Sequence, residues 1–160
     1  ESMTTFEKVS LTILRVTMGW MMFYAGITKV LNPSWSAEGY LASAKTLSGF
    51  FAWFASPALL PYVNFMNEWG LTLLGVSLML GFGVRFSSNL GAVLMLLYYF
   101  PILDGWYPNA HSFLVDEHII YAAVLLVLAA VRAGRVWGID GWGVVSKWSM
   151  TFPSLQKWFG

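Results

Sequence analysis

Three adjacent ionisable residues, Asp116, Glu117 and His118, stand at the beginning of an apolar run. The run Phe113–Val131 has 19 residues, close to the roughly 20 that cross a bilayer core as a helix. Ionisable groups are costly within such a helix, so they usually face protein or water there and carry function. The triplet is therefore the first place in this sequence to look for chemistry.

Helix geometry limits how many of the three side chains can act together. They fan out over roughly 200°, so at most two can point into a helix bundle. We predict that Glu117 and His118 face inward as catalytic residues and that Asp116 faces the connection before the helix. An acidic group near a helix amino terminus is also favoured by the helix dipole, which would explain Asp116 without any role in a site.

Charged residues also interrupt two earlier apolar segments. Arg15 and Lys29 lie in the first, within about 40° of each other around a helix but roughly 21 Å apart along it. Glu68 begins the second segment and is predicted to be a third catalytic residue. Snorkelling of Arg15 and Lys29 to the nearest headgroups is the alternative to a role in a site.

The composition indicates an integral membrane protein. Hydrophobic residues make up 58% of the 160 residues and charged residues only 11%, against roughly 25% charged residues in an ordinary soluble domain. The absence of cysteine excludes disulfides, thiolate metal sites and a thiol relay. No basic run suggests a nucleic-acid partner.

Hydrophobic runs and their breaks predict an all-α fold, an integral membrane four-helix bundle, in one domain over residues 4–142. Residues 36–56 are too polar to span but repeat apolar residues at helical spacing, which predicts an interfacial amphipathic helix between the first and second spans. Residues 143–160 are an aromatic and basic tail of the kind found at lipid headgroups. The four predicted spans are Phe6–Leu31, a segment from after Pro61 to Gly83, Phe86–Leu103 and Phe113–Val131.

The distribution of Lys and Arg predicts the orientation. Seven of the nine fall on one side of the predicted bundle, so the positive-inside rule places both termini in the cytoplasm of a prokaryote, with a multi-pass chain in its cell membrane. Lys29, Glu68, Glu117 and His118 then all come to the outer side. The seven are Lys8, Arg15, Arg85, Arg132, Arg135, Lys147 and Lys157.

Carboxylates, an ammonium and an imidazole at such a boundary could hydrogen-bond the carbonyl oxygens of a quinone and handle its protons. They could also bind an anion at Lys29, or a divalent metal through Glu68, Glu117 and His118. Metal binding is the weaker hypothesis because no ligand pair shares one helix face, so we predict no metal or haem site. Aromatic residues that could line a pocket for a flat ring are Trp20, Tyr24, Tyr98, Tyr99 and Tyr121.

Several separated motifs over residues 10–142 resemble the DoxX/DoxD family of small four-span membrane proteins. The first is an arginine followed by a late Ala-Gly-x-x-Lys, here Arg15 and Ala25 to Lys29. The second runs from a glutamate to Gly-x-x-x-Arg, here Glu68 and Gly81 to Arg85. The third is a closing Gly-Arg…Asp element, here Gly134, Arg135 and Asp140.

DoxD is the large subunit of a thiosulfate:quinone oxidoreductase. The resemblance therefore implies a membrane redox subunit that couples oxidation of a small substrate, such as a sulfur compound, to quinone reduction. It also implies a partner redox subunit, and the residues that match the family's polar core are Arg15, Lys29, Glu68, Glu117 and His118. A homo-oligomer is the other expected assembly. Arg15, Lys29 and Tyr121 are the predicted cofactor-binding residues.

Two other functions stay open on the sequence. The first is a non-enzymatic assembly or structural subunit, in which the charges are internal ion pairs that fix the helix register. The second is a small-ligand or ion transporter. A transporter needs a continuous polar path, and the uncharged middle of the later spans argues against one.

Overall fold

The structure, a computed structural model, describes residues 3–142; the tail predicted over residues 143–160 lies outside them. Throughout this part of the chain every regular element is helical, which confirms the all-α prediction. The α-helices are α1 (Thr5–Val30), α2 (Glu38–Ala42), α3 (Ser48–Phe54), α4 (Leu60–Leu80), α5 (Val84–Ile102) and α6 (Glu117–Ala130). Two short 3₁₀ helices follow, η1 (Ala133–Arg135) and η2 (Ile139–Gly141).

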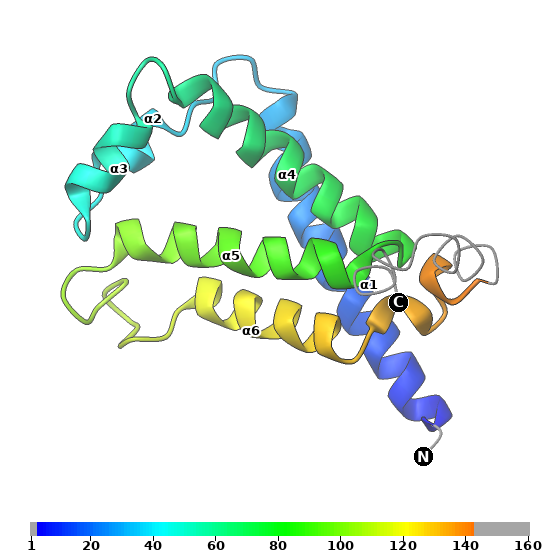
Figure 1. Cartoon of the computed structure of the whole chain (residues 1–160). Helices are drawn as coiled ribbons and strands as arrows, with labels where there is room; N and C mark the ends of the chain where they lie inside the picture. The colour runs from blue at the N-terminus through cyan, green and yellow to red at the C-terminus, as the bar shows by residue number, and fades with distance from the viewer. Residues whose placement is uncertain (1–2, 143–160) are drawn as a thin grey trace.

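The long helices form two pairs. Helix α1 packs mainly on α4, and α5 packs mainly on α6. The pairs meet where a tight turn joins α4 to α5, and they separate toward the opposite end, where α2 and α3 lie (Figure 1). Gly81 and Gly83 form the turn with φ values of 70° and 63°, a conformation that residues with a Cβ atom adopt at a cost. We call this meeting point the closed end and the other the open end.

Glycines let α1 and α4 approach closely. A Cβ atom added to Gly75 would lie 2.3 Å from the backbone nitrogen of Phe23, and one added to Gly26 would lie 2.4 Å from that of Thr72. Such distances exclude a methyl group, so this pair depends on small residues, as helix pairs in membranes commonly do.

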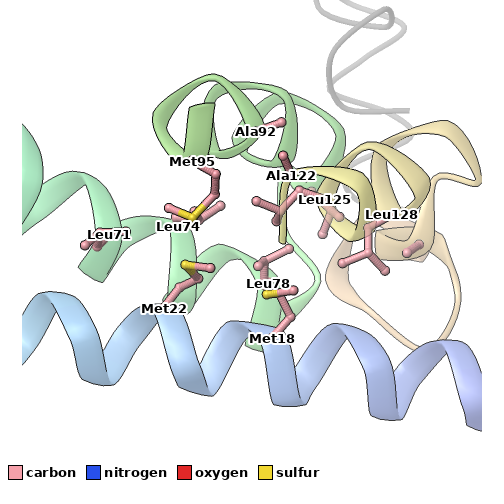
Figure 2. Packing of buried hydrophobic residues seen from close by; sticks show 12 residues of the cluster. Met18, Met22, Leu71, Leu74, Leu78, Ala92, Met95, Ala122, Leu125 and Leu128 are labelled. Carbon is pink, nitrogen blue, oxygen red and sulfur yellow. The ribbon is translucent and has the colours of Figure 1, made fainter. Parts of the chain in front are cut away.

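The hydrophobic core lies where the two pairs meet. Leu78 of α4 and Leu125 and Leu128 of α6 have no exposed surface. Figure 2 shows these leucines packed above α1 with Met18 and Met95. Methionine side chains are flexible and can fill irregular gaps between helices.

The last long helix begins later than predicted. We expected it from Phe113, but α6 begins at Glu117 because the Asp116 carboxylate accepts hydrogen bonds from the backbone N–H groups of His118 and Ile119, at 3.0 and 3.3 Å. This is a helix N-cap. Asp116 stands where the connection meets the helix and is only 3% exposed.

Residues 36–56 form two short helices rather than one. Helices α2 and α3 are separated by a break that ends at Leu47, whose φ is 54°. Ala37, Leu41, Ala44 and Phe51 form a second small core. We call residues 35–56 the cap, because they cover the open end.

Large apolar side chains cover the outside of the long helices. Examples on three of them are Trp20, Leu73 and Leu126, each more than half exposed. Within residues 3–142, no helix meets the combined requirements of length and apolar character for crossing a membrane.

Candidate functional site

A cavity of about 850 Å³ lies between the cap and the open ends of the long helices. Its walls are mostly apolar and aromatic, with contributions from α1 through α6. A volume of this size is in the range of small-molecule pockets. Its polar lining includes Lys29, Asn67, Tyr98, Glu117 and His118, brought together from four different helices.

Lys29, in the last turn of α1, reaches the cavity between two aromatic rings. Its ammonium nitrogen lies 5.1 Å from the ring centre of Trp35 and 5.5 Å from that of Tyr98. These are cation–π distances, which stabilise a charge that is partly withdrawn from water. The side chain can therefore offer a positive charge and N–H donors to a ligand in the cavity.

Tyrosine and asparagine side chains form a chain of hydrogen bonds along one wall. The Tyr98 hydroxyl donates to the Asn67 side-chain oxygen, and the Tyr40 hydroxyl donates to the Tyr98 carbonyl. Asn67 is itself anchored, since its amide donates to the Val63 carbonyl at 2.7 Å. Burial and the nearby carboxylate of Asp116 raise the pKa of Tyr40 to about 12, so this hydroxyl stays protonated. The wall is therefore a fixed polar surface.

His118 lines the cavity beside Tyr98, with its ring centre 6.0 Å from the tyrosine ring centre. The Nδ1 atom of His118 lies 2.7 Å from Oδ2 of Asp116. A carboxylate in this position fixes the tautomer and the orientation of an imidazole. We predicted Asp116 to face the connection and did not predict this contact.

The predicted site residues fall into two groups. Lys29, Glu117 and His118 line the cavity together, whereas Glu68 and Tyr121 are absent from its lining. Glu68 is close enough to Lys29 to interact with its charge but forms no ion pair with it within 4.0 Å. Tyr121 packs against the central hydrophobic core instead. The site roles of all five stay predictions.

Arg15, the sixth predicted site residue, lies at the closed end, away from the cavity. It is 1% exposed, and its Nη2 atom donates to the carbonyls of Val136 and Trp137 at 3.4 Å each. Its Nε and Nη1 atoms have no partner among the described residues. A Cβ atom on Gly81 would lie 1.8 Å from Nη1, so the guanidinium passes directly beneath that glycine.

Asp140 completes the closed end. Its carboxylate accepts hydrogen bonds from the backbone N–H groups of Gly83 and Val84, at 2.8 and 3.1 Å, and so holds the turn between α4 and α5. Burial raises the pKa of Asp140, and these bonds and the charge of nearby Arg15 only partly offset that effect. The arrangement holds the turn between α4 and α5 in place, and the cofactor-binding role of Arg15 stays a prediction.

Three potential metal ligands also meet at the start of α6. Asp116, Glu117 and His118 each offer one ligand atom, and these three atoms lie within 4.8 Å of one another. However, Asp116 already bonds two backbone N–H groups and the His118 ring. The prediction that this chain has no metal site stays a prediction.

Comparison with known protein families identifies the chain. A family model described as DoxX matches residues 10–104, more than half of the sequence. The chain belongs to the DoxX family. The match includes Arg15, Lys29 and Glu68 but ends before α6, so it is shorter than the resemblance over residues 10–142 suggested.

DoxX proteins are generally membrane associated, and the apolar composition of this chain is consistent with that. No curated protein and no solved structure matches the chain.

Proposed function

We propose that this DoxX protein is a membrane redox subunit that binds a quinone in the cavity beneath the cap. The cavity itself carries this proposal. The cavity has a volume of about 850 Å³, and its walls are mostly apolar and aromatic with a few charged and polar groups. This is the usual composition of a site for a flat organic cofactor.

The polar groups suit the two ends of a quinone ring. Lys29 offers N–H donors from α1 on one side, and His118 offers an imidazole from α6 on the other. Between them stands the ring of Tyr98, 5.5 Å from the Lys29 ammonium nitrogen and 6.0 Å from the His118 ring centre. Both groups can form hydrogen bonds to the oxygens of one bound ring.

Glu68 and Glu117 are proposed to exchange protons with the bound ring through Lys29 and His118. Glu117 is exposed and borders the cavity, so it can pass protons to and from water. With no cysteine in this chain, we assign the electrons to a partner subunit that oxidises a small substrate, such as a sulfur compound.

We further propose that the four long helices lie in the lipid bilayer with both ends of the chain on the cytoplasmic side. The exposed apolar side chains of α1, α4, α5 and α6 support contact with lipid. The beginning of α1, the beginning of α5 and the end of α6 lie toward the closed end, and the sequence has Lys8, Arg85 and Arg132 at these three places. Lys29 in the last turn of α1 and Lys45 between α2 and α3 belong to the open end. The excess of positive charge favours the closed end as the cytoplasmic side.

Binding of a quinone to the purified protein tests the proposal. A short-chain quinone titrated into the protein in mild detergent should bind, and Lys29→Met should weaken binding about tenfold or more, since it removes a charged hydrogen-bond donor. Glu117→Gln should not weaken binding, because an ionised carboxylate and a quinone oxygen both only accept hydrogen bonds. Lys45→Met is the matched control, because the Lys45 side chain is 59% exposed and pairs with Asp104 outside the cavity. Equal affinity in all four proteins would refute quinone binding at this site.

The topology has a clean test because the chain has no cysteine. Single cysteines introduced at Ser34 or His111, both exposed near the open end, should react with a membrane-impermeant maleimide added to intact cells. A cysteine at Met3 should react only after the cells are broken. The opposite pattern, or equal labelling of all three, would contradict the proposed orientation.

One observation favours the alternative of a non-enzymatic assembly subunit. Several polar groups of the cavity already bond one another, as in the pairs Tyr98–Asn67 and Asp116–His118. In that case Lys29→Met would lower the melting temperature in detergent and no quinone would bind to the unmodified protein. The two functions therefore give opposite results in the same titration.

A further inference from the structure

The contact between Asp116 and His118 indicates which form of the ligand the cavity prefers. This inference rests on the proposed function. Asp116 is 3% exposed, and its Oδ1 atom accepts the backbone N–H groups of His118 and Ile119. Its Oδ2 atom lies 2.7 Å from Nδ1 of His118. Both carboxylate oxygens are therefore used within the first turn of α6.

Asp116 acts here as an acceptor: its carboxylate already accepts two backbone N–H groups, and an ionised carboxylate has no hydrogen to donate. The hydrogen in the Asp116–His118 contact must then come from Nδ1. In a neutral imidazole only one nitrogen carries hydrogen. The Nε2 atom is therefore left with a lone pair, and within residues 3–142 no other hydrogen bond engages the His118 ring.

We propose that neutral His118 offers its Nε2 atom to the cavity as a hydrogen-bond acceptor, so that the cavity prefers a hydroquinone or phenol, which bears a hydroxyl donor, over the corresponding quinone. Asp116 is the positioning residue that fixes this tautomer. The imidazole is the group that contacts the ligand.

The other groups around the ring fit the same ligand. Lys29 can only donate, and an oxygen of either form of the ligand can accept from it. Tyr98 has its hydroxyl committed to Asn67, and Tyr40 has its hydroxyl committed to the Tyr98 carbonyl. Glu117 is exposed, and an ionised carboxylate can only accept, so it too would favour a ligand hydroxyl. His118 differs from Glu117 because Asp116 fixes which of its two nitrogens accepts.

The substitution Asp116→Asn tests the role of the carboxylate while keeping its shape. The introduced amide oxygen must stay on the two backbone N–H groups of the cap, so the amide N–H₂ would face Nδ1. An amide donor there moves the imidazole hydrogen to Nε2 and turns that atom from an acceptor into a donor. The preference for the reduced ligand should then shift toward the oxidised one.

The measurement compares tetramethyl-1,4-benzoquinone with its hydroquinone, without oxygen and at about pH 8, where free imidazole is neutral. We expect the unmodified protein to bind the hydroquinone more tightly, and Asp116→Asn to change the ratio of the two affinities about tenfold or more in favour of the quinone. Both ligands binding with an unchanged ratio would overturn this inference and leave quinone binding intact. Neither ligand binding would refute the proposed function instead.

Nitrogen NMR of ¹⁵N-histidine reads the tautomer directly, whether or not any ligand binds. The chain has two histidines, and His111→Gln removes the exposed one to give a single set of signals. Hydrogen on Nδ1 of His118 in the ligand-free protein is the expected result. Hydrogen on Nε2 would overturn the inference even if Asp116→Asn failed to fold.

Discussion

The two ends of the molecule use polar residues in opposite ways. At the closed end, Arg15 donates to the backbone carbonyls of Val136 and Trp137, and Asp140 accepts from backbone N–H groups of the turn between α4 and α5. At the open end, Lys29 and His118 line a cavity of about 850 Å³. Both ends contain buried charged or polar groups, but the cavity lies at the open end.

This contrast teaches that a charged residue in an apolar helix is not by itself a sign of a binding site. Arg15 and Lys29 lie in the same helix and both interrupt its apolar sequence. What separates them is the presence or absence of a cavity, which depends on residues far away in the chain. Four predictions test this contrast, from the largest expected effect to the smallest.

The strongest effect on stability should come from Gly75→Ala. The new methyl group would lie 2.3 Å from the backbone of Phe23, so α1 and α4 must move apart, at a cost of about 2–3 kcal/mol or more. Gly70→Ala in the same helix is the control, since nothing lies within 4 Å of its Cβ position. Thermal melts in detergent should show a large decrease for Gly75→Ala and none for Gly70→Ala; equal melting temperatures would contradict the packing described here.

Arg15→Met should lower stability without affecting quinone binding. It leaves the carbonyls of Val136 and Trp137 without their donor and removes the charge near Asp140, and loss of one partner from a buried polar group costs about 1–3 kcal/mol. Quinone affinity per folded molecule should match that of the unmodified protein. A tenfold loss of affinity would instead make Arg15 a cofactor-binding residue and join the two ends.

Asp140 should give the closed end a dependence on pH. A carboxyl with a raised pKa in the folded state contributes stability that is present below its unfolded pKa and is lost as the pH rises through the folded pKa. The melting temperature of the unmodified protein should therefore fall relative to that of Asp140→Asn as the pH increases above about 4. Parallel curves for the two proteins would show that burial does not control this carboxyl.

The smallest effect is expected at the attachment of the cap. The ion pair Lys45–Asp104 is exposed, so Lys45→Ala should cost less than about 1 kcal/mol. Thr46→Val should cost more, because the hydroxyl donates to the Leu103 carbonyl at 2.6 Å in a partly buried position. Melting temperatures of the two variants give the order, and the reverse order would mean that the ion pair holds the cap.

The helices themselves could be predicted from the sequence because apolar runs and their breaks mark them. The first predicted span, Phe6–Leu31, closely matches α1, Thr5–Val30. The start of α6 was placed too early because an apolar run does not reveal where a carboxylate caps the backbone. Leu47 was equally hidden, since a positive φ at a leucine has no signature in its neighbours.

The candidate site was only partly visible in the sequence. The orientation deduced from the positive charges predicted that Lys29, Glu117 and His118 lie on the same side of the bundle. In the structure these three residues line one cavity. Asn67 and Asp116 were missed because their roles depend on which side chains face them across helices. Asp116 did carry one usable signal, since an aspartate two residues before a histidine at a helix start can reach both the backbone and the ring.

The mouth of the cavity determines how a ligand would arrive. Exposed residues of its lining, Tyr62 and Met66 on α4 and Leu97 on α5, lie on the outer surfaces of those helices. In the proposed bilayer these surfaces meet acyl chains, so an oily molecule can enter sideways without passing through water. Occupancy of the cavity would then depend on the mole fraction of this molecule in the lipid. Adding lipid or detergent would lower that mole fraction and so would lower the occupancy.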